Sequence, residues 1–268
     1  MNSSKWLWRG CLIAAGLASI LCLAGFGYAV KEVWFPPSNN LGEGPLQPVQ
    51  PGVSNPNSIE IVTLGDSLTK GTGDQTGKGY VGNVQEMLSR KSGKPVHVLG
   101  NYGVNGYTTQ QLLDDLEKQQ AIREQLAKAD VVLLTIGGND LYAIGRDLVE
   151  SSGEQLDPDV VKARMPEPLK RLERIFGIVA KTNPKAAFAY VSLYNPFYDT
   201  DTNRELSAHV QEWNTTASKL AARYPNMTVV PTFDLFQANF AKNIYTDHFH
   251  PNQMGYEAIA ERVVQALP

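Results

Sequence analysis

Three apolar runs that each end in a polar, glycine-containing turn constrain the fold of this chain most strongly. The turns contain Ser67, Gly106 and Asn139, and each follows a segment rich in Val, Ile and Leu. A stretch with helical apolar spacing comes after each turn. This order is typical of strand–turn–helix units, in which the turn lies at the carboxyl end of a strand. Open α/β sheets form their ligand sites at that edge.

The same alternation continues along the chain and predicts its architecture. Strands are predicted near 59–64, 95–100, 130–136, 186–193 and 227–231. Helices are predicted near 79–92, 108–127, 159–182, 203–223 and 255–266. Successive strand–helix–strand units give a parallel sheet with helices on both faces. We therefore expect an α/β domain of three layers, α/β/α, around about five parallel strands.

The N-terminal segment predicts export. Lys5 and Arg9 precede an uncharged run over 11–30, which is long enough to cross a hydrocarbon core of about 30 Å. Positive charge before such a run predicts a cytoplasmic N-terminus and an exported body. Residues 1–30 are expected to be a membrane anchor or a signal peptide cleaved near 27–29. The catalytic domain would then be held outside the cytoplasm by the anchor, or secreted if the segment is cleaved.

The rest of the chain divides into a linker and one domain. Residues 31–57 are rich in Pro, Gly, Asn and Ser and lack apolar periodicity, which predicts an extended linker. The globular domain is expected over 58–268. Within it, 141–168 contains several proline and glycine breaks and is the one irregular insertion that we expect. It is either a lid over the substrate or a solvated connection with one short helix.

Composition excludes several classes of function. The 268-residue chain has a net charge of −3 and no basic block interleaved with aromatic residues, so no nucleic-acid partner is expected. Its only cysteines, Cys11 and Cys22, lie in the N-terminal apolar run. The domain therefore lacks a thiol for a disulfide, a thiolate metal site or a cysteine nucleophile. No phosphate-binding Gly-Lys-Ser/Thr sequence is found after the first strand, and we expect no cofactor.

Ser67 is a candidate nucleophile. It follows the first predicted strand in the sequence Gly-Asp-Ser-Leu at 65–68. Glycine permits a tight turn, and a serine at the start of a helix has backbone N–H groups beside its Oγ. The alternative is that Asp66 and Ser67 only form an N-cap pair. The segment lacks the Gly-x-Ser-x-Gly elbow of α/β-hydrolases.

Asn139 and Gly106 are candidate oxyanion donors. Asn139 follows a buried strand pattern, where its amide would point into a cleft at the sheet edge. Gly106 can bring a bare backbone N–H close to a substrate. The alternative is that Gly103 and Gly106 are turn glycines and that Asn139 forms an Asx-turn or caps a helix.

Four histidines are available as a base, in two kinds of surroundings. His97 lies in a strand pattern and His209 in a helical pattern, and both are most simply structural. His248 and His250 lie together just before the last predicted helix.

Asp247 precedes His250 by three residues, so one turn of chain can bring its carboxylate to the imidazole. Asp247 would then orient His250 while the histidine accepts the proton of Ser67. Asp247, His248 and His250 are also three plausible metal ligands. No second His or Cys cluster is present to complete a metal site, so we expect no metal.

Four ordered blocks together resemble the SGNH hydrolases, also called GDSL-type lipases and esterases. The blocks are Gly-Asp-Ser-Leu at 65–68, the glycine block at 101–106, Gly-Gly-Asn-Asp at 137–140 and Asp-His-Phe-His at 247–250. The resemblance covers about 58–268. It implies a flavodoxin-like three-layer fold and an esterase or lipase that forms an acyl-enzyme.

The resemblance also implies roles for individual residues. Ser67, Asp247 and His250 would form the catalytic triad. The Ser67 N–H, the Gly106 N–H and the Asn139 amide would form the oxyanion hole. Gly106 is preferred to Gly103 because in similar sequences the donor glycine precedes a polar residue and the following helix.

The expected substrate is a small-molecule, lipid or glycan acyl ester. The alternatives are an O-acetyl-polysaccharide esterase on the same fold and a non-catalytic surface protein that uses the scaffold for binding. The sequence shows no long apolar stripe for deep lipid insertion, so a short acyl chain is expected. The membrane would be contacted through the N-terminal segment only.

Overall fold

The computed structural model describes residues 55–152 and 158–268. The predicted anchor over 1–30 and nearly all of the predicted linker lie outside the described residues. Within the described residues, no helix combines the length and the apolar character that crossing a membrane requires.

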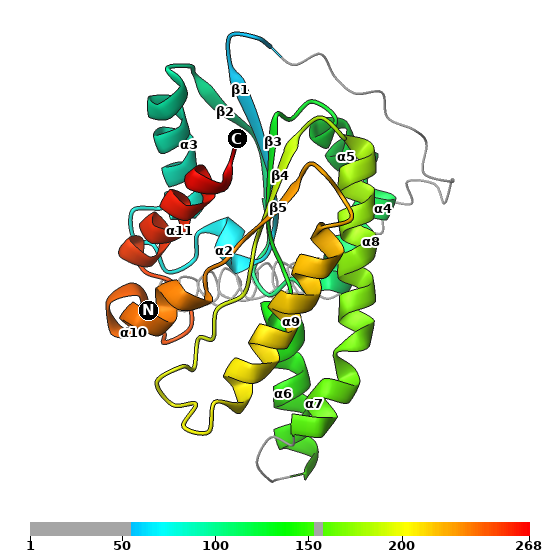
Figure 1. Ribbon diagram of the computed structural model, residues 1–268, viewed down its shortest axis with the longest axis vertical. Coiled ribbons are helices and arrows are strands. Elements are labelled where there is room, and N and C mark those ends of the chain that lie inside the picture. The colour runs from blue at the N-terminus through cyan, green and yellow to red at the C-terminus, as the bar shows by residue number, and fades with distance from the viewer. Residues whose placement is uncertain (1–54, 153–157) are drawn as a thin grey trace, which may run out of the picture. The chain divides into compact units, whose positions relative to one another are not determined.

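A five-stranded parallel sheet forms the centre of the domain (Figure 1). Its spatial order is β2-β1-β3-β4-β5. The strands are β1 (Ile59–Gly65), β2 (Val96–Gly103), β3 (Val131–Thr135), β4 (Ala187–Val191) and β5 (Met227–Val230). After β1 the chain builds outward on one side with β2 and then on the other with β3. In this flavodoxin-like order, the carboxyl ends of β1 and β3 form the topological switch point where ligands bind.

Helices cover both faces of the sheet, as predicted (Figure 1). One face is covered by α3 (Gly79–Ser92), α10 (Phe233–Asn243) and α11 (Gln253–Ala266). The other is covered by α4 (Thr109–Lys118), α5 (Gln120–Leu126), α8 (Pro166–Thr182) and α9 (Glu205–Ala221).

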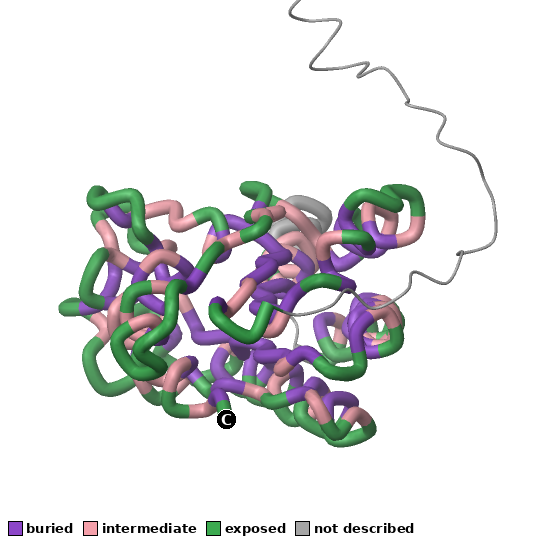
Figure 2. Tube along the Cα trace, turned by 90° about the horizontal axis from the view of Figure 1, so that it is seen from above, coloured by how far each residue is buried: buried purple, intermediate pink, exposed green. Residues whose placement is uncertain are grey.

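Alternation along each strand divides the core into two clusters. In β3, Val132 and Leu134 pack into the cluster on the α8 side, whereas Val131 and Leu133 pack into the cluster on the α11 side. This follows from the two-residue period of a strand, with both faces buried. Figure 2 shows the result, with the buried residues inside and the exposed ones on the outer turns and helix faces.

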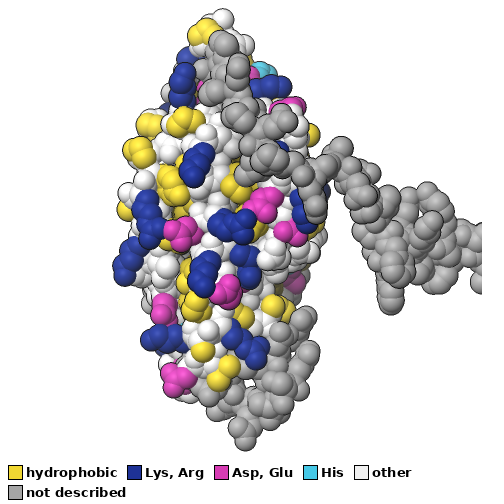
Figure 3. Space-filling view, turned by 90° about the vertical axis from the view of Figure 1, so that its right-hand side faces the viewer, with side chains coloured by type: hydrophobic (Ala, Val, Ile, Leu, Met, Phe, Trp, Pro, Cys, Tyr) yellow, Lys and Arg dark blue, Asp and Glu magenta, His cyan; other side chains and the backbone are white. Residues whose placement is uncertain are grey.

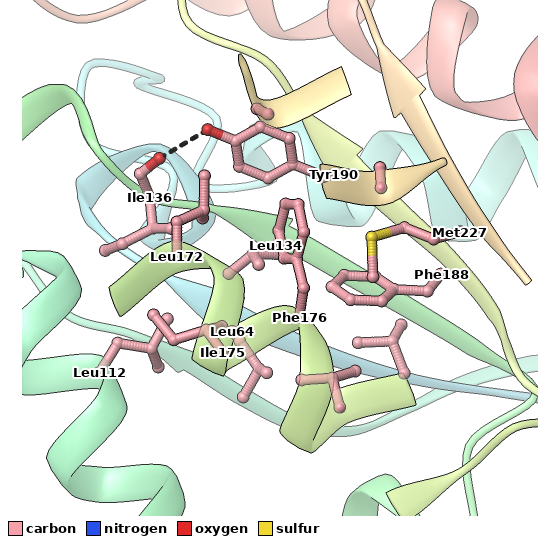
Figure 4. Packing of buried hydrophobic residues seen from close by; sticks show 14 of the residues in the cluster. Leu64, Leu112, Leu134, Ile136, Leu172, Ile175, Phe176, Phe188, Tyr190 and Met227 are labelled. Atoms are coloured by element: carbon pink, nitrogen blue, oxygen red, sulfur yellow. Dashed lines mark hydrogen bonds between the residues drawn. The ribbon is translucent and has the colours of Figure 1, made fainter. Parts of the chain in front are cut away.

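The α8-side cluster contains polar groups that are paired. Phe176 of α8 packs edge-on against Phe188 and Tyr190 of β4 (Figure 4). The Tyr190 hydroxyl donates to the Ile136 carbonyl at 2.9 Å and accepts a hydrogen bond from Trp213 Nε1 at 2.9 Å. Because a buried hydroxyl without partners is costly, these bonds fix the orientation of the ring.

The outer face shown in Figure 3 mixes charges of both signs. Lys and Arg side chains lie between Asp and Glu side chains, and several are paired. Lys118 contacts Asp114 at 3.4 Å, and Arg174 pairs with Glu117. Such exposed pairs add little to stability, and this face presents no patch of a single charge.

The prediction for 141–168 was wrong in one respect, because most of this span is helical. Helix α6 (Gly138–Ser152) begins inside the predicted turn, and α7 (Pro158–Arg164) precedes α8. The prolines were interpreted as breaks, but Pro158 and Pro166 each stand at the start of a helix, where the missing N–H of proline costs nothing. The short helix α2 (Ser67–Lys70) and α10 were also not predicted.

Candidate active site

Ser67 is the first residue of α2 and lies two residues after the end of β1, at the switch point. Its side chain is nearly buried, with 4% of the residue exposed. Asp66 is the N-cap, and its carboxylate accepts a hydrogen bond from the Leu68 N–H at 3.0 Å. The cap is therefore formed by Asp66 alone, and the Ser67 hydroxyl is left for another partner.

A buried polar network holds this turn against β3. Thr135 Oγ1 donates to Asp66 at 2.7 Å and lies 2.7 Å from Thr69 Oγ1. Burial raises the pKa of Asp66, and the bonds from Thr135 and Leu68 oppose that shift. Gly65 has φ +139°, and a Cβ there would lie 2.0 Å from the Thr135 carbonyl oxygen. Only glycine fits this close approach between the two strands.

His250 connects Ser67 to Asp247. His250 Nε2 lies 2.9 Å from Ser67 Oγ, and His250 Nδ1 lies 2.7 Å from an Asp247 carboxylate oxygen. Desolvation acts to raise the pKa of Asp247. The hydrogen bonds from the His250 ring and from the N–H groups of His250 and Phe249 outweigh it, so the pKa of Asp247 lies below its ordinary value. An ionised Asp247 selects the tautomer in which Nδ1 carries a proton and Nε2 accepts one from Ser67.

The loop that carries Asp247 and His250 is tightly fixed. His248 has φ +55°, a left-handed conformation that turns the chain between the two residues. Asn252 caps α11, accepting from the Gly255 N–H at 3.0 Å and donating to the Ile244 carbonyl at 3.1 Å. His248 is exposed and does not join the hydrogen-bonded series.

Asn139 lies in the first turn of α6, at the end of β3. Its Nδ2 donates to the Tyr107 carbonyl at 2.8 Å. Because Nδ2 carries two protons, one N–H remains for a ligand while the other holds the amide in place. Asn139 and Ser67 line one cavity.

The next residue, Asp140, anchors the opposite loop. Its carboxylate accepts hydrogen bonds from the Thr109 N–H at 2.8 Å and the Thr109 hydroxyl at 2.7 Å. Arg171 Nε donates to the same hydroxyl at 2.9 Å, and its guanidinium lies 3.4 Å from Asp140. Burial raises the pKa of Asp140, and the bonds from Thr109 and the charge of Arg171 oppose the shift. Together, Asn139 and Asp140 tie α6 to the loop that contains Gly106.

Gly106 and Gly103 differ in what their N–H groups do. The Gly103 N–H donates to Asn101 Oδ1 at 2.9 Å, so it is already used. Gly106 is exposed, has φ +79° and has open space around its Cα. Its N–H takes part in none of the hydrogen bonds formed among the described residues of this loop.

A cavity of about 440 Å³ opens beside Ser67. Residues of α6, α7, α9 and the segment after β4 form its largely apolar wall. A cleft at this edge of the sheet was expected beside Asn139, but its walls could not be predicted because they come from helices far apart in the chain. His209 of α9, which was interpreted as structural, lines this cavity.

No group of three His, Cys, Asp or Glu side chains is placed to hold a metal ion within 55–152 and 158–268. Two members of the alternative metal set, Asp247 and His250, are hydrogen-bonded to each other, and His250 is also hydrogen-bonded to Ser67.

Two supporting residues were missed from the sequence. Gly73, with φ +96°, lies directly against His250, and the signal for it was the second glycine of the Gly-Thr-Gly sequence at 71–73. Arg171 reaches Asp140 from α8, and nothing in the local sequence marks it.

Comparison with known proteins gives a consistent result. The model of the GDSL-like lipase/acylhydrolase family matches residues 63–258. The chain is 38% identical over 213 residues to YpmR of Bacillus subtilis (strain 168), covering 78% of this chain and 81% of that protein. It is 25% identical over 207 residues to the spore germination lipase LipC of Bacillus licheniformis, covering 77% and 95%.

Among solved structures, the lipase Lip_vut3 from a goat rumen metagenome superimposes with a TM-score of 0.67 at 26% identity. The match covers 78% of this chain and 97% of that one.

Proposed function

Because the chain belongs to the GDSL-like lipase/acylhydrolase family and is thus a carboxylic ester hydrolase, we propose that it cleaves acyl esters through Ser67, His250 and Asp247. One observation carries the proposal. Ser67 Oγ, the His250 ring and the Asp247 carboxylate form a continuous series of hydrogen bonds of 2.9 and 2.7 Å. Nucleophile, base and orienting carboxylate in this order are the requirement for an activated serine.

In the first half-reaction, Ser67 Oγ attacks the ester carbonyl carbon while His250 Nε2 accepts the hydroxyl proton. The carbon–oxygen double bond opens, and its oxygen becomes an oxyanion. When this intermediate collapses, the bond to the alcohol oxygen breaks and His250 returns the proton to that oxygen. Asp247 remains ionised and stabilises the imidazolium.

In the second half-reaction, a water molecule replaces the alcohol. His250 Nε2 takes one proton from the water as its oxygen adds to the acyl carbon. Collapse of the second intermediate breaks the bond to Ser67 Oγ, which recovers the proton from His250. The products are the free carboxylic acid and the original serine.

Three donors are proposed to stabilise the oxyanion. They are the N–H of Ser67, the N–H of Gly106 and the remaining Asn139 amide proton. The proposal is supported by the Asn139 bond to Tyr107, which orients the amide before substrate arrives. Donors that are fixed in advance need no reorganisation during the reaction, which is why such groups contribute strongly.

The reaction is proposed to take place outside the cytoplasm. Support comes from the Lys5 and Arg9 charges ahead of the apolar run over 11–30. Protease treatment of intact cells, followed by detection of the domain and N-terminal sequencing of the purified protein, tests both export and cleavage. A domain that is protected in intact cells and found in the cytosolic fraction contradicts this part of the proposal.

A fluorophosphonate probe tests the catalytic proposal on the full chain. We expect labelling at Ser67, identified by peptide mass spectrometry, together with hydrolysis of p-nitrophenyl esters. Ser67→Ala should lose both. A folded wild-type protein that takes no label and hydrolyses no ester would instead support the alternative of a non-catalytic binding module.

A further inference from the structure

The cavity beside Ser67 begins at the nucleophile and continues along α6. Gly138, Leu141, Tyr142 and Gly145 line it, and their spacing places them on one face of the helix. Two of the four are glycines, which have no side chain and therefore leave space along this face of the helix. The α6 side of the cavity thus consists of one apolar strip that starts next to Asn139.

Another part of the wall comes from α9 and α7. Leu206 and Val210 of α9 lie one helical turn apart and line the cavity, as does Val161 of α7. Both valines are buried. These three side chains can make apolar contacts with a bound ligand but cannot form hydrogen bonds with it.

Three aromatic rings meet near the nucleophile. Tyr142 stacks on Phe197 with ring centroids 6.4 Å apart, and Phe249 contacts them at 5.8 and 5.9 Å. Phe249 also precedes His250 and packs edge-on against its ring at 5.0 Å. Tyr142 is 48% exposed, so these rings form an apolar mouth between solvent and the cavity.

The position of the cavity decides which part of an ester it can hold. The leaving alcohol must depart beside His250, because His250 returns the proton to it. His250 does not line the cavity, whereas Ser67 and Asn139 do. A group that extends from the carbonyl carbon into this space is therefore the acyl chain.

We propose that this cavity binds the acyl chain and makes the enzyme selective for chains of about twelve to sixteen carbons, since a volume of about 440 Å³ holds at most about fifteen water-sized groups of roughly 30 Å³ each. The inference rests on the proposed function and replaces the short chain expected from the sequence. Acetate would leave almost all of this apolar surface uncovered, palmitate would fill the space, and stearate would exceed it.

A series of p-nitrophenyl esters from acetate to stearate, hydrolysed by the full chain, measures the selectivity. Each methylene that enters the cavity is expected to raise kcat/KM by up to about fourfold. The increase should continue to a maximum between dodecanoate and palmitate and reverse at stearate. A maximum at acetate or butyrate, or one at stearate, overturns the proposal.

Two variants that fill the cavity locate the site. Gly145→Leu and Val210→Phe each place a larger apolar group in it, and the ratio of kcat/KM for decanoate to that for acetate should fall at least tenfold. Ala208→Phe on the exposed face of α9 is the matched control and should leave the ratio unchanged. Melting temperatures are measured in parallel, because side chains that enter an existing cavity should not destabilise the fold as overpacking does.

The outcomes separate this inference from the proposed function. If esters of every length are inert and Ser67 takes no fluorophosphonate, the proposed function fails. If Ser67 is active but folded Gly145→Leu and Val210→Phe keep the wild-type chain-length profile, only the cavity assignment fails.

Discussion

Gly73 lies directly against His250. A Cβ at position 73 would come within 2.9 Å of the His250 Cβ and 2.5 Å of the Pro251 carbonyl oxygen. The second contact involves backbone, so it cannot be relieved by a side-chain rotation. The segment that follows α2 therefore contacts His250 through Gly73 and holds it in position.

We therefore expect Gly73→Ala to lower kcat/KM by about 100-fold, since a displacement near 1 Å in a reacting group costs that much. Gly77→Ala is the matched control. Gly77 also has a positive φ, of +72°, but a Cβ there meets nothing within 4 Å. Both variants carry backbone strain, and only Gly73→Ala should lose activity beyond what its melting temperature explains. Equal activities in the two variants would contradict the positioning role of Gly73.

His250 rather than His248 should act as the base. His250→Asn removes the ring that bonds Ser67 and should reduce kcat by a factor of 100 or more. His248→Asn tolerates the left-handed backbone at this position and should keep most of the activity. The measurement is kcat for a p-nitrophenyl ester in both variants, and the reverse ranking would refute the assignment.

Much of the fold followed from the sequence because the signals are local. Buried strands such as β3 are short apolar runs, and their order along the chain required a parallel sheet. The predictions of family and fold are confirmed, whereas the catalytic roles of Ser67, Asp247 and His250 remain predictions supported by their geometry.

Two features were not predicted, for different reasons. Helix α6 was missed because Gly138-Asn139-Asp140 has the composition of a turn and the proline and glycine residues over 141–168 indicate breaks, although the residues after Asn139 have helical apolar spacing. The cavity, in contrast, is a non-local feature. The cavity arises from the separation of α6 and α9. No property of either segment alone encodes that separation.

Asp247→Asn tests the orienting carboxylate and its charge. The pKa of Asp247 is below its ordinary value, so the carboxylate stays ionised from neutral pH into the mildly acidic range. The variant should therefore lose about 100- to 10,000-fold in kcat across that whole range, because the amide selects the wrong tautomer. Recovery of activity near pH 5 would contradict an ionised carboxylate as the active form.

The same group links stability to pH with a definite sign. A lowered pKa in the folded state means that the charged carboxylate stabilises the fold above the unfolded pKa of about 4, and that this contribution disappears as pH falls through the folded value. The difference in melting temperature between wild type and Asp247→Asn should therefore be largest near neutral pH and shrink below about pH 4.

The hydrogen bonds between Thr109 and Asp140 should position the loop that contains Gly106. Thr109→Val keeps the shape of the side chain and removes the hydroxyl that bonds Asp140 and Arg171. We expect kcat to fall about tenfold with little change in KM, because the loop still binds substrate but holds its donors less well. Thr228→Val, at an exposed position in β5, is the control. A change confined to the melting temperature would reduce Thr109 to a purely structural residue.

The buried side chain of His209 should lower the free energy of unfolding. Only 8% of the residue is exposed, and its Nε2 is buried with no hydrogen-bond partner among the described residues. An unpaired buried polar atom costs about 1 to 3 kcal/mol, whereas an apolar group of similar size carries no such penalty. His209→Leu should therefore raise the free energy of unfolding by about 1 kcal/mol.

His209→Leu should also raise kcat/KM for decanoate more than for acetate, since an imidazole in the cavity wall is replaced by an apolar side chain. His97→Leu, the same exchange at an exposed position in β2, should change neither quantity. A destabilised His209→Leu protein would mean that the imidazole has a favourable role in the wall, and a gain shared equally by acetate and decanoate would place His209 outside the path of the acyl chain.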